Sequence, residues 1–386
     1  MTQPARRGVR RFLRLALACV GLWLLWVCLL RPISPRVGPA PAAVADGWSL
    51  GSLQQAGLNP AQLTQVANRL FEKRLNVHSL LIERHGCLAA EYYQGGTDKS
   101  VYSLLPSRHR FGPRDKQDVR SIGKSITSLL YGLAREQGKV PAVETTVWAA
   151  FPEHGNRRTA ANQAIRIEDL LNMTSGLQWQ EGKPGPNDEL RLFWKSDLVD
   201  FVLSHPQAAV PNTCFNYNGG GTALLAELIR RGTGQSLEQY ADEMLFRPLQ
   251  IEDWAWVPDV HGRAMAFNGL RLRPRDLLKV GRLMLNHGAW QGRQLVPQAW
   301  IAQSMTPRFD TDVRDYRYAY QWWHGTATWH GQRIDWHAGF GNGGQRLYVV
   351  PALDLSVVTT AGAYDELPTA IRVNDLIQEV VDAVEN

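Results

Sequence analysis

The chain has 386 residues, of which 44% are hydrophobic and 20% are charged, a composition that excludes a disordered chain and fits a globular protein. The formal net charge is +6, but seven arginines precede the first acidic residue, Asp46, so residues 46–386 carry −1. The basic character therefore belongs to the N-terminus. The folded part lacks the excess of Lys and Arg that a nucleic-acid-binding surface needs, so we expect no nucleic-acid partner.

Residues 1–45 are predicted to be a membrane anchor or signal segment with a Pro-rich linker. The basic stretch RRGVRRFLR precedes sixteen uncharged apolar residues, LALACVGLWLLWVCLL (15–30). This run is long for a signal-peptide core and slightly short for a bilayer span of about 20 residues. Arginines ahead of it would stay in the cytoplasm, which places the rest of the chain outside. We expect a retained single anchor in the cell membrane. The alternative is a secreted protein cleaved near Ala43-Val44-Ala45.

The cysteines give little information on a disulfide. Cys87 and Cys214 are the only pair beyond the apolar run. An oxidising compartment would permit a bridge between them, but their separation in sequence carries no pairing geometry. The sequence therefore leaves the bridge undecided.

The predicted elements begin after the linker RPISPRVGPAPAAVADG (31–47). Residues 59–74 have apolar residues at helical spacing, with Asn59 as cap and Pro60 in the first turn. Residues 77–95 alternate about a Gly turn and predict a β-hairpin. A long helix starts at Ser121. The region 140–305 is mostly helical, with helices near 167–173, 221–231, 236–245, 275–287 and 297–304.

Strands return at 331–339, 345–351 and 353–362, and an amphipathic helix closes the chain over 366–386. Strands thus lie near both ends of the sequence, with a helical block between them. This order predicts an α/β (α+β) fold: one antiparallel sheet built from both ends, flanked by terminal helices, with an inserted all-helical region. Neither end could close the sheet alone, so residues 46–386 are expected to form one catalytic domain.

Ser121-Ile-Gly-Lys124 is the first stretch that can carry chemistry. A serine hydroxyl is a weak nucleophile until a base takes its proton. A lysine three residues later on a helix lies on the same face, within reach of the hydroxyl. The positive end of the helix dipole favours a neutral amine, and free N–H groups there can stabilise an oxyanion. Taken alone, the motif fits a surface helix start better than a catalytic site.

Two further stretches strengthen this interpretation. Tyr217 stands before a Gly-rich turn into a helix, where its hydroxyl can face a cleft; a lysine ammonium beside it would make the phenol more acidic and a better general base. His337-Ala338-Gly339 ends a strand, and His337, with Asp335 to orient it, could hydrogen-bond a substrate carboxylate or carbonyl, or Tyr217. The N–H of Phe340 could donate to an oxyanion. A core tyrosine and a structural histidine are the alternatives.

Together these stretches resemble the serine beta-lactamase-like superfamily, which includes class C beta-lactamases, D-alanyl-D-alanine carboxypeptidases, esterases and 6-aminohexanoate-dimer hydrolases. The likeness spans roughly residues 48–386 and includes DVRSIGKSITSLLYGLAREQGKV, IEDLLNMTSGLQW, YQWW and HAGFGNGGQ. It implies that fold and an acyl-enzyme mechanism. The matching residues are the nucleophile Ser121, its partner base Lys124, the tyrosine Tyr217, oxyanion donors at the N–H groups of Ser121 and Phe340, and His337-Ala338-Gly339 in the place of Lys-Thr-Gly.

Two departures from the family pattern bear on the substrate. The segment Tyr217-Asn218-Gly219 has its asparagine at +1 and glycine at +2, so the amide that grips a lactam is displaced. No Lys-Thr-Gly or Lys-Ser-Gly exists, so the cation for a penicillin carboxylate is replaced by His337. Asn218 and Gly339 are expected to contact the substrate. An ordinary histidine is mostly neutral at pH 7, so any beta-lactam activity is expected to rise towards pH 6.

Other motifs do not fit their usual roles. GWSLG (47–51) matches Gly-x-Ser-x-Gly, but no strand precedes it and no helix follows directly. GFGNGG (339–344) matches a dinucleotide motif, but a strand follows where a helix is needed. Asn172 lies in a sequon at an apolar helix end, where glycosylation is not expected. No zinc-like spacing of ligands occurs, so we expect no metal and no cofactor.

The sequence thus predicts a serine hydrolase that forms an acyl-enzyme with a small ester or amide substrate outside the cytoplasm. A D-Ala carboxypeptidase or weak beta-lactamase is the alternative among enzymes. A catalytically idle protein that binds peptides or cell-wall fragments is the alternative from another class. The sequence does not determine the acyl group, the leaving group or the oligomeric state.

Overall fold

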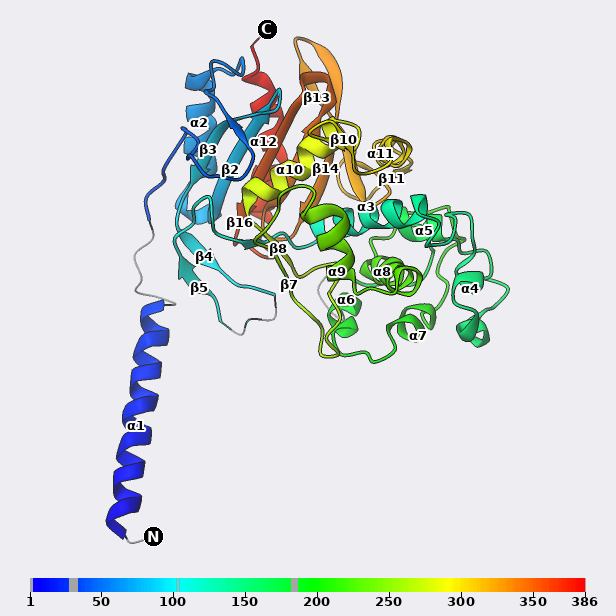
Figure 1. The fold of residues 1–386 in the computed structure, drawn as a ribbon, viewed down its shortest axis with the longest axis horizontal. Coiled ribbons are helices and arrows are strands. Elements are labelled where there is room, and N and C mark those ends of the chain that lie inside the picture. Colours follow the sequence, from blue (N-terminus) through cyan, green and yellow to red (C-terminus); the bar gives the residue numbers. More distant parts are fainter. Residues whose placement is uncertain (1–2, 28–33, 102, 104, 182–186, 386) are drawn as a thin grey trace.

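The computed structural model describes residues 3–27, 34–101, 103, 105–181 and 187–385, and Figure 1 shows a sheet with a helical region beside it. The helices of these residues are α1 (Gln3–Leu25), α2 (Pro60–Leu70), α3 (Ile122–Glu136), α4 (Val147–Ala150), α5 (Ile167–Leu171), α6 (Asp188–Leu192), α7 (Leu198–Leu203), α8 (Gly219–Thr233), α9 (Leu237–Ala241), α10 (Pro274–Leu285), α11 (Gln298–Ser304) and α12 (Leu367–Asp382). The strands are β1 (Ser49–Leu50), β2 (Val77–Arg84), β3 (Cys87–Tyr93), β4 (Gly96–Asp98), β5 (Ser107–His109), β6 (Gln117–Asp118), β7 (Ala255–Trp256), β8 (Leu270–Leu272), β9 (Ala289–Trp290), β10 (Arg293–Gln294), β11 (Phe309–Asp310), β12 (Arg317–Ala319), β13 (Trp322–Trp329), β14 (Gln332–Gly341), β15 (Gln345–Val350) and β16 (Leu355–Ala361).

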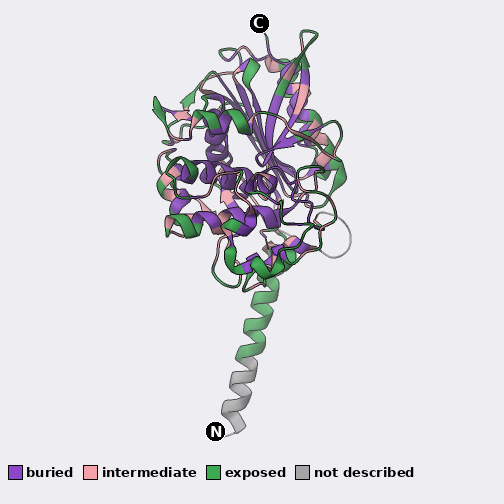
Figure 2. Cartoon of the chain, turned by 90° about the vertical axis from the view of Figure 1, so that its right-hand side faces the viewer, coloured by how far each residue is buried: buried purple, intermediate pink, exposed green. Residues whose placement is uncertain are grey.

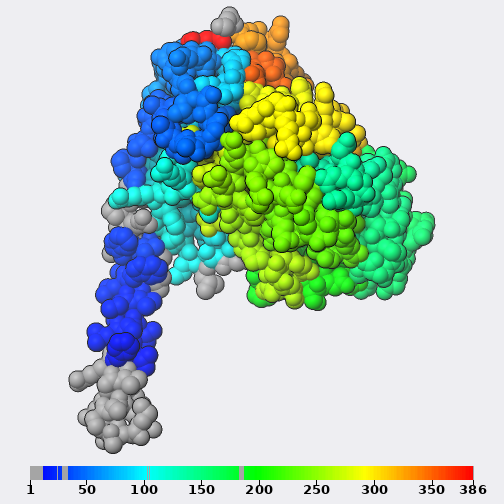
Figure 3. Space-filling model, in the orientation of Figure 1, coloured from blue at the N-terminus to red at the C-terminus, as the bar shows by residue number. Residues whose placement is uncertain are grey.

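The central sheet combines both ends of the chain, as the sequence predicts. Its nine strands run in the order β1-β3-β2-β16-β15-β14-β13-β12-β11. Antiparallel pairing of β2 with β16 joins the two halves, and only the short β1 runs parallel to its neighbour, β3. In Figure 3 the lighter blue part that follows α1 and the orange and red C-terminal part accordingly lie together, at the end of the molecule opposite α1.

Each face of the sheet buries a separate apolar cluster, because alternate side chains of a strand point to opposite faces. In β2, Leu80 and Ile82 belong to the cluster that includes α2 and α12, whereas Leu81 belongs to the cluster that includes α3 and α10. Fully burying one such leucine or isoleucine side chain contributes about 1.5–3 kcal/mol. The strands are accordingly purple, meaning buried, in Figure 2. The sheet is therefore a rigid middle layer on which α3 is fixed.

Local signals explain where the first elements begin and turn. The Asn59 side chain accepts a hydrogen bond from the Gln62 N–H at 3.0 Å and caps α2, and Pro60 opens the helix. The hairpin of β2 and β3 turns at His85-Gly86, both with positive φ, which matches a tight two-residue turn. These features confirm the predicted helix start and hairpin.

The inserted helical region lies beside the sheet in Figure 1, and α3 connects the two. Helix α3 packs against α8 in the helical region and against β14 and β15 in the sheet. Nearly all of its residues are buried. The site at the start of α3 therefore lies where the two regions meet.

The described part of the predicted linker packs along β3. Val37 forms a β-bridge with Tyr93, and the Ala42 N–H donates to the Glu91 carboxylate at 2.9 Å. Arg275 of α10 binds Asp46 at 2.5 Å and Glu91 at 2.8 Å. Residues 34–46 thus cover the outer edge of β3, which would otherwise present unpaired backbone groups.

Helix α1 extends away from the rest of the chain in Figure 1. Its described apolar side chains, such as Phe12 and Leu17, are exposed. Within the described ranges, no helix combines the length and the apolar character that a membrane crossing requires. Residues 28–30 of the predicted apolar run lie outside these ranges.

Candidate active site

Ser121 lies at the start of α3, where the backbone is held in an uncommon conformation. Arg120, directly before it, has a φ of +52°, which is costly for a residue with a Cβ and recurs at functional sites. The N–H groups of Ile122, Gly123 and Lys124 donate to carbonyls of residues 119–121. Among the described residues, no backbone acceptor receives the Ser121 N–H, which is therefore available to an incoming oxygen.

Lys124 is fully buried one turn into α3, and its Nζ lies 3.0 Å from each of four oxygens. These are Ser121 Oγ, Glu181 Oε1, Glu189 Oε2 and the carbonyl oxygen of Phe267. Burial lowers the pKa of Lys124, but the charges of Glu181 and Glu189 outweigh burial, and the pKa is raised. Lys124 is thus an ammonium at neutral pH. The neutral amine expected from the helix dipole is not the resting form, because the charges of Glu181 and Glu189 outweigh the effect of the dipole on the pKa of Lys124.

Tyr217 completes a cluster with Ser121 and Lys124. The Lys124 Nζ lies 4.8 Å from the centre of the Tyr217 ring. Burial and the carboxylates of Glu181 and Glu189 raise the pKa of Tyr217. The charge of Lys124 and a hydrogen bond with Ser121 lower this pKa. The net shift of the pKa is upward. This direction is opposite to the one expected from the lysine alone. Tyr217 is therefore a neutral phenol at neutral pH and can give a proton.

Glu181 and Glu189 form a carboxyl pair that the sequence analysis did not single out. Their inner oxygens, Glu181 Oε1 and Glu189 Oε2, face the lysine. Their outer oxygens take neutral donors: Glu181 Oε2 accepts from Trp179 Nε1 at 3.0 Å and from the Gly219 N–H at 2.7 Å, and Glu189 Oε1 accepts from Asn268 Nδ2 at 2.9 Å. All four oxygens thus have partners, which fixes the orientation of both carboxyl groups.

The two carboxyl groups titrate differently. Burial and the negative charge of Glu189 raise the pKa of Glu181 to about 8, although Lys124 opposes the shift. Burial also raises the pKa of Glu189, but Lys124 and hydrogen bonds from Glu181, Lys124 and Asn268 outweigh burial and lower it. Near neutral pH one proton therefore resides on Glu181, and the group of Lys124, Glu181 and Glu189 has no net charge.

The pair also explains the glycine at position 219. A Cβ on Gly219 would lie 3.0 Å from Glu181 Oε2 and 3.1 Å from Glu189 Oε2. The two carboxyl groups thus take up the space into which a side chain at this position would project. Glycine also lets its N–H approach Glu181 closely.

Ser121 opens onto a cleft between α3, the end of β14 and the start of α12. Its lining includes Arg120, Ser121, Glu181, Asn187, Glu189, Tyr217, Asn268, Trp323, Phe340, Asn342, Arg346, Asp365, Glu366, Leu367 and Ala370. Trp323 stacks on Phe340 at 5.3 Å between ring centres and on Tyr217 at 5.8 Å, which forms an aromatic wall. A Cβ on Gly341 would lie 2.3 Å from the Val119 carbonyl, so glycine is needed where β14 approaches the chain ahead of Ser121. This approach brings the Phe340 backbone to the same cleft.

Comparison with known proteins identifies the family. The family model described as Beta-lactamase matches residues 84–382. The chain belongs to this beta-lactamase family.

One relative of this beta-lactamase-family protein and two solved structures of similar fold are described by name. A 6-aminohexanoate-dimer hydrolase of Paenarthrobacter ureafaciens is 25% identical over 325 residues, 77% of this chain and 76% of the relative. A Bacillus anthracis protein provisionally named a 6-aminohexanoate-dimer hydrolase has a TM-score of 0.67 at 17% identity, over 90% of each chain. A family VIII carboxylesterase has a TM-score of 0.60 at 14% identity, over 83% of this chain and 98% of the other. The two structures share the fold.

The structure does not bring His337 to the cleft lining. Its Nδ1 lies 2.7 Å from Nδ1 of His324 on the neighbouring strand, and both rings are buried. Burial lowers the pKa of His337 to about 4, although exposed Asp335 opposes the shift. The residue in the place of the family lysine is therefore neutral across the physiological range and paired with a second histidine.

The two predicted substrate-binding residues also have structural partners. The Asn218 side chain accepts from the Gly221 N–H at 3.1 Å and caps α8, and Asn218 is buried. Gly339 packs on α3, where a Cβ would lie 3.0 Å from Ile122 and 3.3 Å from Ser125 Oγ. Neither lines the cleft, whereas Phe340 does. Both residues position the segments that carry Tyr217 and Phe340.

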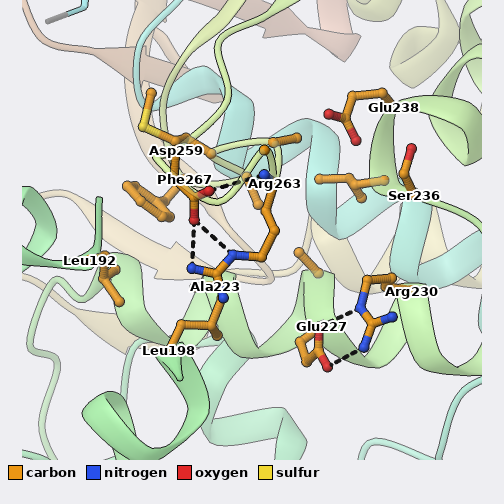
Figure 4. A pocket seen from close by; sticks show the side chains of 16 residues that line it. Leu192, Leu198, Ala223, Glu227, Arg230, Ser236, Glu238, Asp259, Arg263 and Phe267 are labelled. Carbon is orange, nitrogen blue, oxygen red and sulfur yellow. Dashed lines mark hydrogen bonds and ion pairs between the residues drawn. The ribbon is translucent and has the colours of Figure 1, made fainter. Parts of the chain in front are cut away.

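A second, more apolar cavity lies on the other side of the loop that carries Phe267. Figure 4 shows Leu192, Leu198 and Phe267 around it, with ion pairs between Arg263 and Asp259 and between Arg230 and Glu227. The Ser236 hydroxyl in its lining caps α9 by accepting from the Gln239 N–H. Two arginines of its lining, Arg230 and Arg263, are thus already paired with carboxylates, and Ser121 and Tyr217 do not line it.

The remaining motifs do not take the roles that their patterns suggest, although GFGNGG contributes to the cleft lining. Ser49 of GWSLG is exposed in β1, and the next helix is α2. A strand, β15, follows GFGNGG. Asn172 is buried, and Cys87 and Cys214 are both free thiols. Among the described residues, no group of three or more His, Cys, Asp or Glu side chains is arranged to hold a metal ion.

Proposed function

We propose that this protein is a serine hydrolase that cleaves uncharged or small esters and amides through an acyl-enzyme on Ser121. The observation that carries the proposal is the distance of 3.0 Å between Ser121 Oγ and Lys124 Nζ at the floor of a cleft that Tyr217 also lines. A hydroxyl within hydrogen-bond reach of a proton acceptor is the arrangement that nucleophilic catalysis needs.

The reaction would proceed in two stages. Once Lys124 has released a proton, Ser121 Oγ attacks the substrate carbonyl while its own proton moves to the Lys124 amine. The N–H groups of Ser121 and Phe340 hold the oxyanion, and Tyr217, a neutral phenol, gives a proton to the leaving group. Water then attacks the acyl group by the reverse sequence and releases the acid.

The position of His337 supports a substrate without a carboxylate at the point where the family lysine would pair with one; the arginines of the cleft lining are Arg120 and Arg346. An unpaired carboxylate in a partly dry site is costly. His337 cannot supply a cation there, because it is neutral at pH 7 and paired with His324. The aromatic wall of Tyr217, Trp323 and Phe340 suits an apolar acyl group. By their names, the Paenarthrobacter relative hydrolyses an amide dimer and the family VIII relative an ester.

The test is a substrate panel of p-nitrophenyl esters, short D-amino-acid peptides, linear amide dimers and nitrocefin. We expect a higher kcat/KM for short esters than for nitrocefin at pH 7.5. With the pKa of His337 at about 4, the ratio of the two should stay within about twofold between pH 6 and 7.5. The rise expected from an ordinary histidine is thus no longer predicted. A preference for nitrocefin or D-Ala peptides would favour the weak beta-lactamase or the D-Ala carboxypeptidase. Tight binding of peptides without any turnover would favour the catalytically idle protein.

We also propose that the N-terminal segment attaches the protein to the cell membrane, with the catalytic part outside the cytoplasm. Seven arginines precede Asp46, and apolar side chains of α1 such as Phe12 and Leu17 are exposed. Removal of residues 1–33, which leaves residues 34–46 docked on β3, should give a soluble and active protein. Recovery of the full chain in the soluble fraction after cell breakage would contradict the proposal.

A further inference from the structure

Lys124 cannot accept the proton of Ser121 while it is an ammonium. An ammonium has three N–H groups and no lone pair. Here it faces four oxygens at 3.0 Å, of which Glu181, Glu189 and the Phe267 carbonyl engage all three N–H groups when both carboxyls are ionised. Ser121 Oγ is the fourth neighbour. A proton must therefore leave Lys124 towards another group before Ser121 can be activated.

We propose that Glu181 and Glu189 are the proton-accepting pair that converts Lys124 into the base for Ser121. This inference rests on the proposed function, in which Ser121 is the nucleophile. The two glutamates act through Lys124 and do not contact the substrate carbonyl. They are positioning residues that determine which form of the lysine faces the serine.

The proton transfer balances in charge and atoms. In the active form Lys124 is an ammonium and both carboxyls are ionised. One N–H proton moves from Lys124 to Glu181, which then shares it with Glu189 through the hydrogen bond between the two groups. The freed lone pair of Nζ takes the proton of Ser121 while Oγ bonds to the carbonyl carbon. The carbonyl π electrons move to the oxygen. When they re-form the carbonyl, the bond to the leaving group breaks, the serine proton passes through Lys124 and Tyr217 to the leaving group, and the proton on Glu181 returns to Lys124.

The contacts of the pair suit this role. One negative charge remains on the pair after the transfer. The donors on the outer oxygens, Trp179 Nε1, the Gly219 N–H and Asn268 Nδ2, hold this charge without supplying a proton. The inner oxygens of Glu181 and Glu189 lie 3.0 Å from Nζ, so the proton crosses a hydrogen bond already formed. The pair is therefore preorganised to take a proton from Lys124.

The titration of the pair gives the sign of the pH dependence. The titratable groups that face it are Lys124 on α3, Tyr217 ahead of α8 and Tyr318 on β12. Burial and the charge of Glu189 raise the pKa of Glu181 to about 8. Below pH 8 one acceptor position is already occupied by a proton. Activation of Ser121 should therefore increase as the pH rises through about 8 and level off above it.

The experiment measures the rate at which a fluorophosphonate labels Ser121 from pH 6 to 10, read by mass spectrometry. Fluoride leaves without a proton donor, so the rate reports activation of the nucleophile alone. We expect the unmodified protein to show a rise centred near pH 8. Glu189→Gln should move this rise at least one pH unit lower, because Glu181 loses the neighbouring charge. Glu181→Gln should remove the rise and lower the rate at pH 9 at least 100-fold.

Glu83→Gln is the matched control. Glu83 is also buried, pairs with Arg282 at 3.1 Å and has a pKa raised by burial to about 7, but it lies on β2 away from the cleft. The Glu83→Gln substitution should leave the pH profile of Ser121 labelling unchanged. Near-UV circular dichroism checks the fold of each variant, and the Glu189→Gln shift suffices if Glu181→Gln does not fold.

Two failures are distinguishable. An unlabelled Ser121 in the unmodified protein contradicts the proposed function. A labelled Ser121 whose pH profile is the same in Glu181→Gln and Glu189→Gln overturns the role of the pair alone. A faster reaction in Glu181→Gln/Glu189→Gln would also overturn it, because Lys124 would then be the better base without the carboxylates.

Discussion

Two buried clusters of this protein each hold one cation between two carboxyl groups. In the first, Arg275 binds Asp46 and Glu91, and the side chains of both carboxylates are 2% exposed. In the second, Lys124 contacts Glu181 and Glu189, whose side chains are 8% and 14% exposed. The first cluster ties the N-terminal segment to the sheet and is closed to solvent. The second opens onto the cleft beside Ser121.

The difference between the clusters lies in what their cations can do. A guanidinium keeps its proton at every accessible pH and binds carboxylates through a planar fork. An ammonium can pass a proton to a neighbouring group. The Arg275 cluster is therefore suited only to hold segments together, whereas the Lys124 cluster can change its protonation during a reaction. Buried charges alone do not mark a functional site; the type of cation and access to the cleft do.

Exchanging the cation of the second cluster should have the largest effect. Lys124→Arg keeps the charge between Glu181 and Glu189 but removes the group that can release a proton. We expect kcat/KM for a p-nitrophenyl ester to fall at least about 10³-fold, within the range attributed to general base catalysis. The measurement is steady-state hydrolysis at pH 8.5. Activity within tenfold of the unmodified protein would mean that the lysine acts only as a fixed charge.

Removing the cation of the first cluster should affect stability and leave the chemistry intact. Arg275→Ala leaves the buried carboxylates of Asp46 and Glu91 without a cation, which should cost about 3–5 kcal/mol of unfolding free energy. Urea unfolding measures this loss, and the folded fraction should keep its esterase activity. Arg74→Ala is the matched control, because its ion pair with Glu72 is exposed and should contribute about 0–1 kcal/mol. Equal losses of unfolding free energy in Arg275→Ala and Arg74→Ala would contradict the stabilising role of the Arg275 cluster.

The burial of His337 beside His324 should have a smaller effect, a loss of unfolding free energy at acid pH. The pKa of His337 is about 4 when folded, because burial disfavours its charged form, and about 6.5 when unfolded. The unfolded chain therefore binds more protons between these values. Stability is fully present above pH 6.5 and falls by about 1–3 kcal/mol as the pH drops to 4. His337→Asn should flatten this slope in urea unfolding at several pH values, and an unchanged slope would exclude the pair as its source.

Ser49→Ala should have the smallest effect. Ser49 carries a motif resembling a nucleophile elbow, but it is exposed in β1 at the edge of the sheet. We expect ester hydrolysis within twofold of the unmodified protein. A loss of more than tenfold would show that the wrong serine has been assigned.

The sequence predicts the fold well where local patterns are strong. The hairpin of β2 and β3, the capped start of α2 and the joining of both chain ends in one sheet follow from periodicity and turn residues. Strand β13 was not predicted, because WWHGTATW mixes buried and half-buried positions without regular alternation. It pairs with β14 across a two-residue turn at His330-Gly331, both with positive φ, as β2 pairs with β3.

The candidate site was predicted only in part, because some of its residues are brought together by the fold and not by their spacing in the sequence. Ser121 and Lys124 share one helix turn, so their proximity follows from spacing. Glu181 lies in a loop with no periodic signal, and Glu189 lies in the short helix α6. Only the folded chain brings both residues to Lys124. The pairing of His337 depends on the His324 ring, whereas the partner of Asn218 is local, the Gly221 N–H in the first turn of α8. Protonation states could not be derived from the motif, because they depend on charges distant in sequence.

The most direct test of the central claim is peptide mapping of the protein after reaction with a fluorophosphonate. The account predicts one adduct, on the peptide that contains Ser121, and no adduct in Ser121→Ala of unchanged fold. An adduct on Ser49 or another serine, or equal labelling of Ser121→Ala, would contradict it.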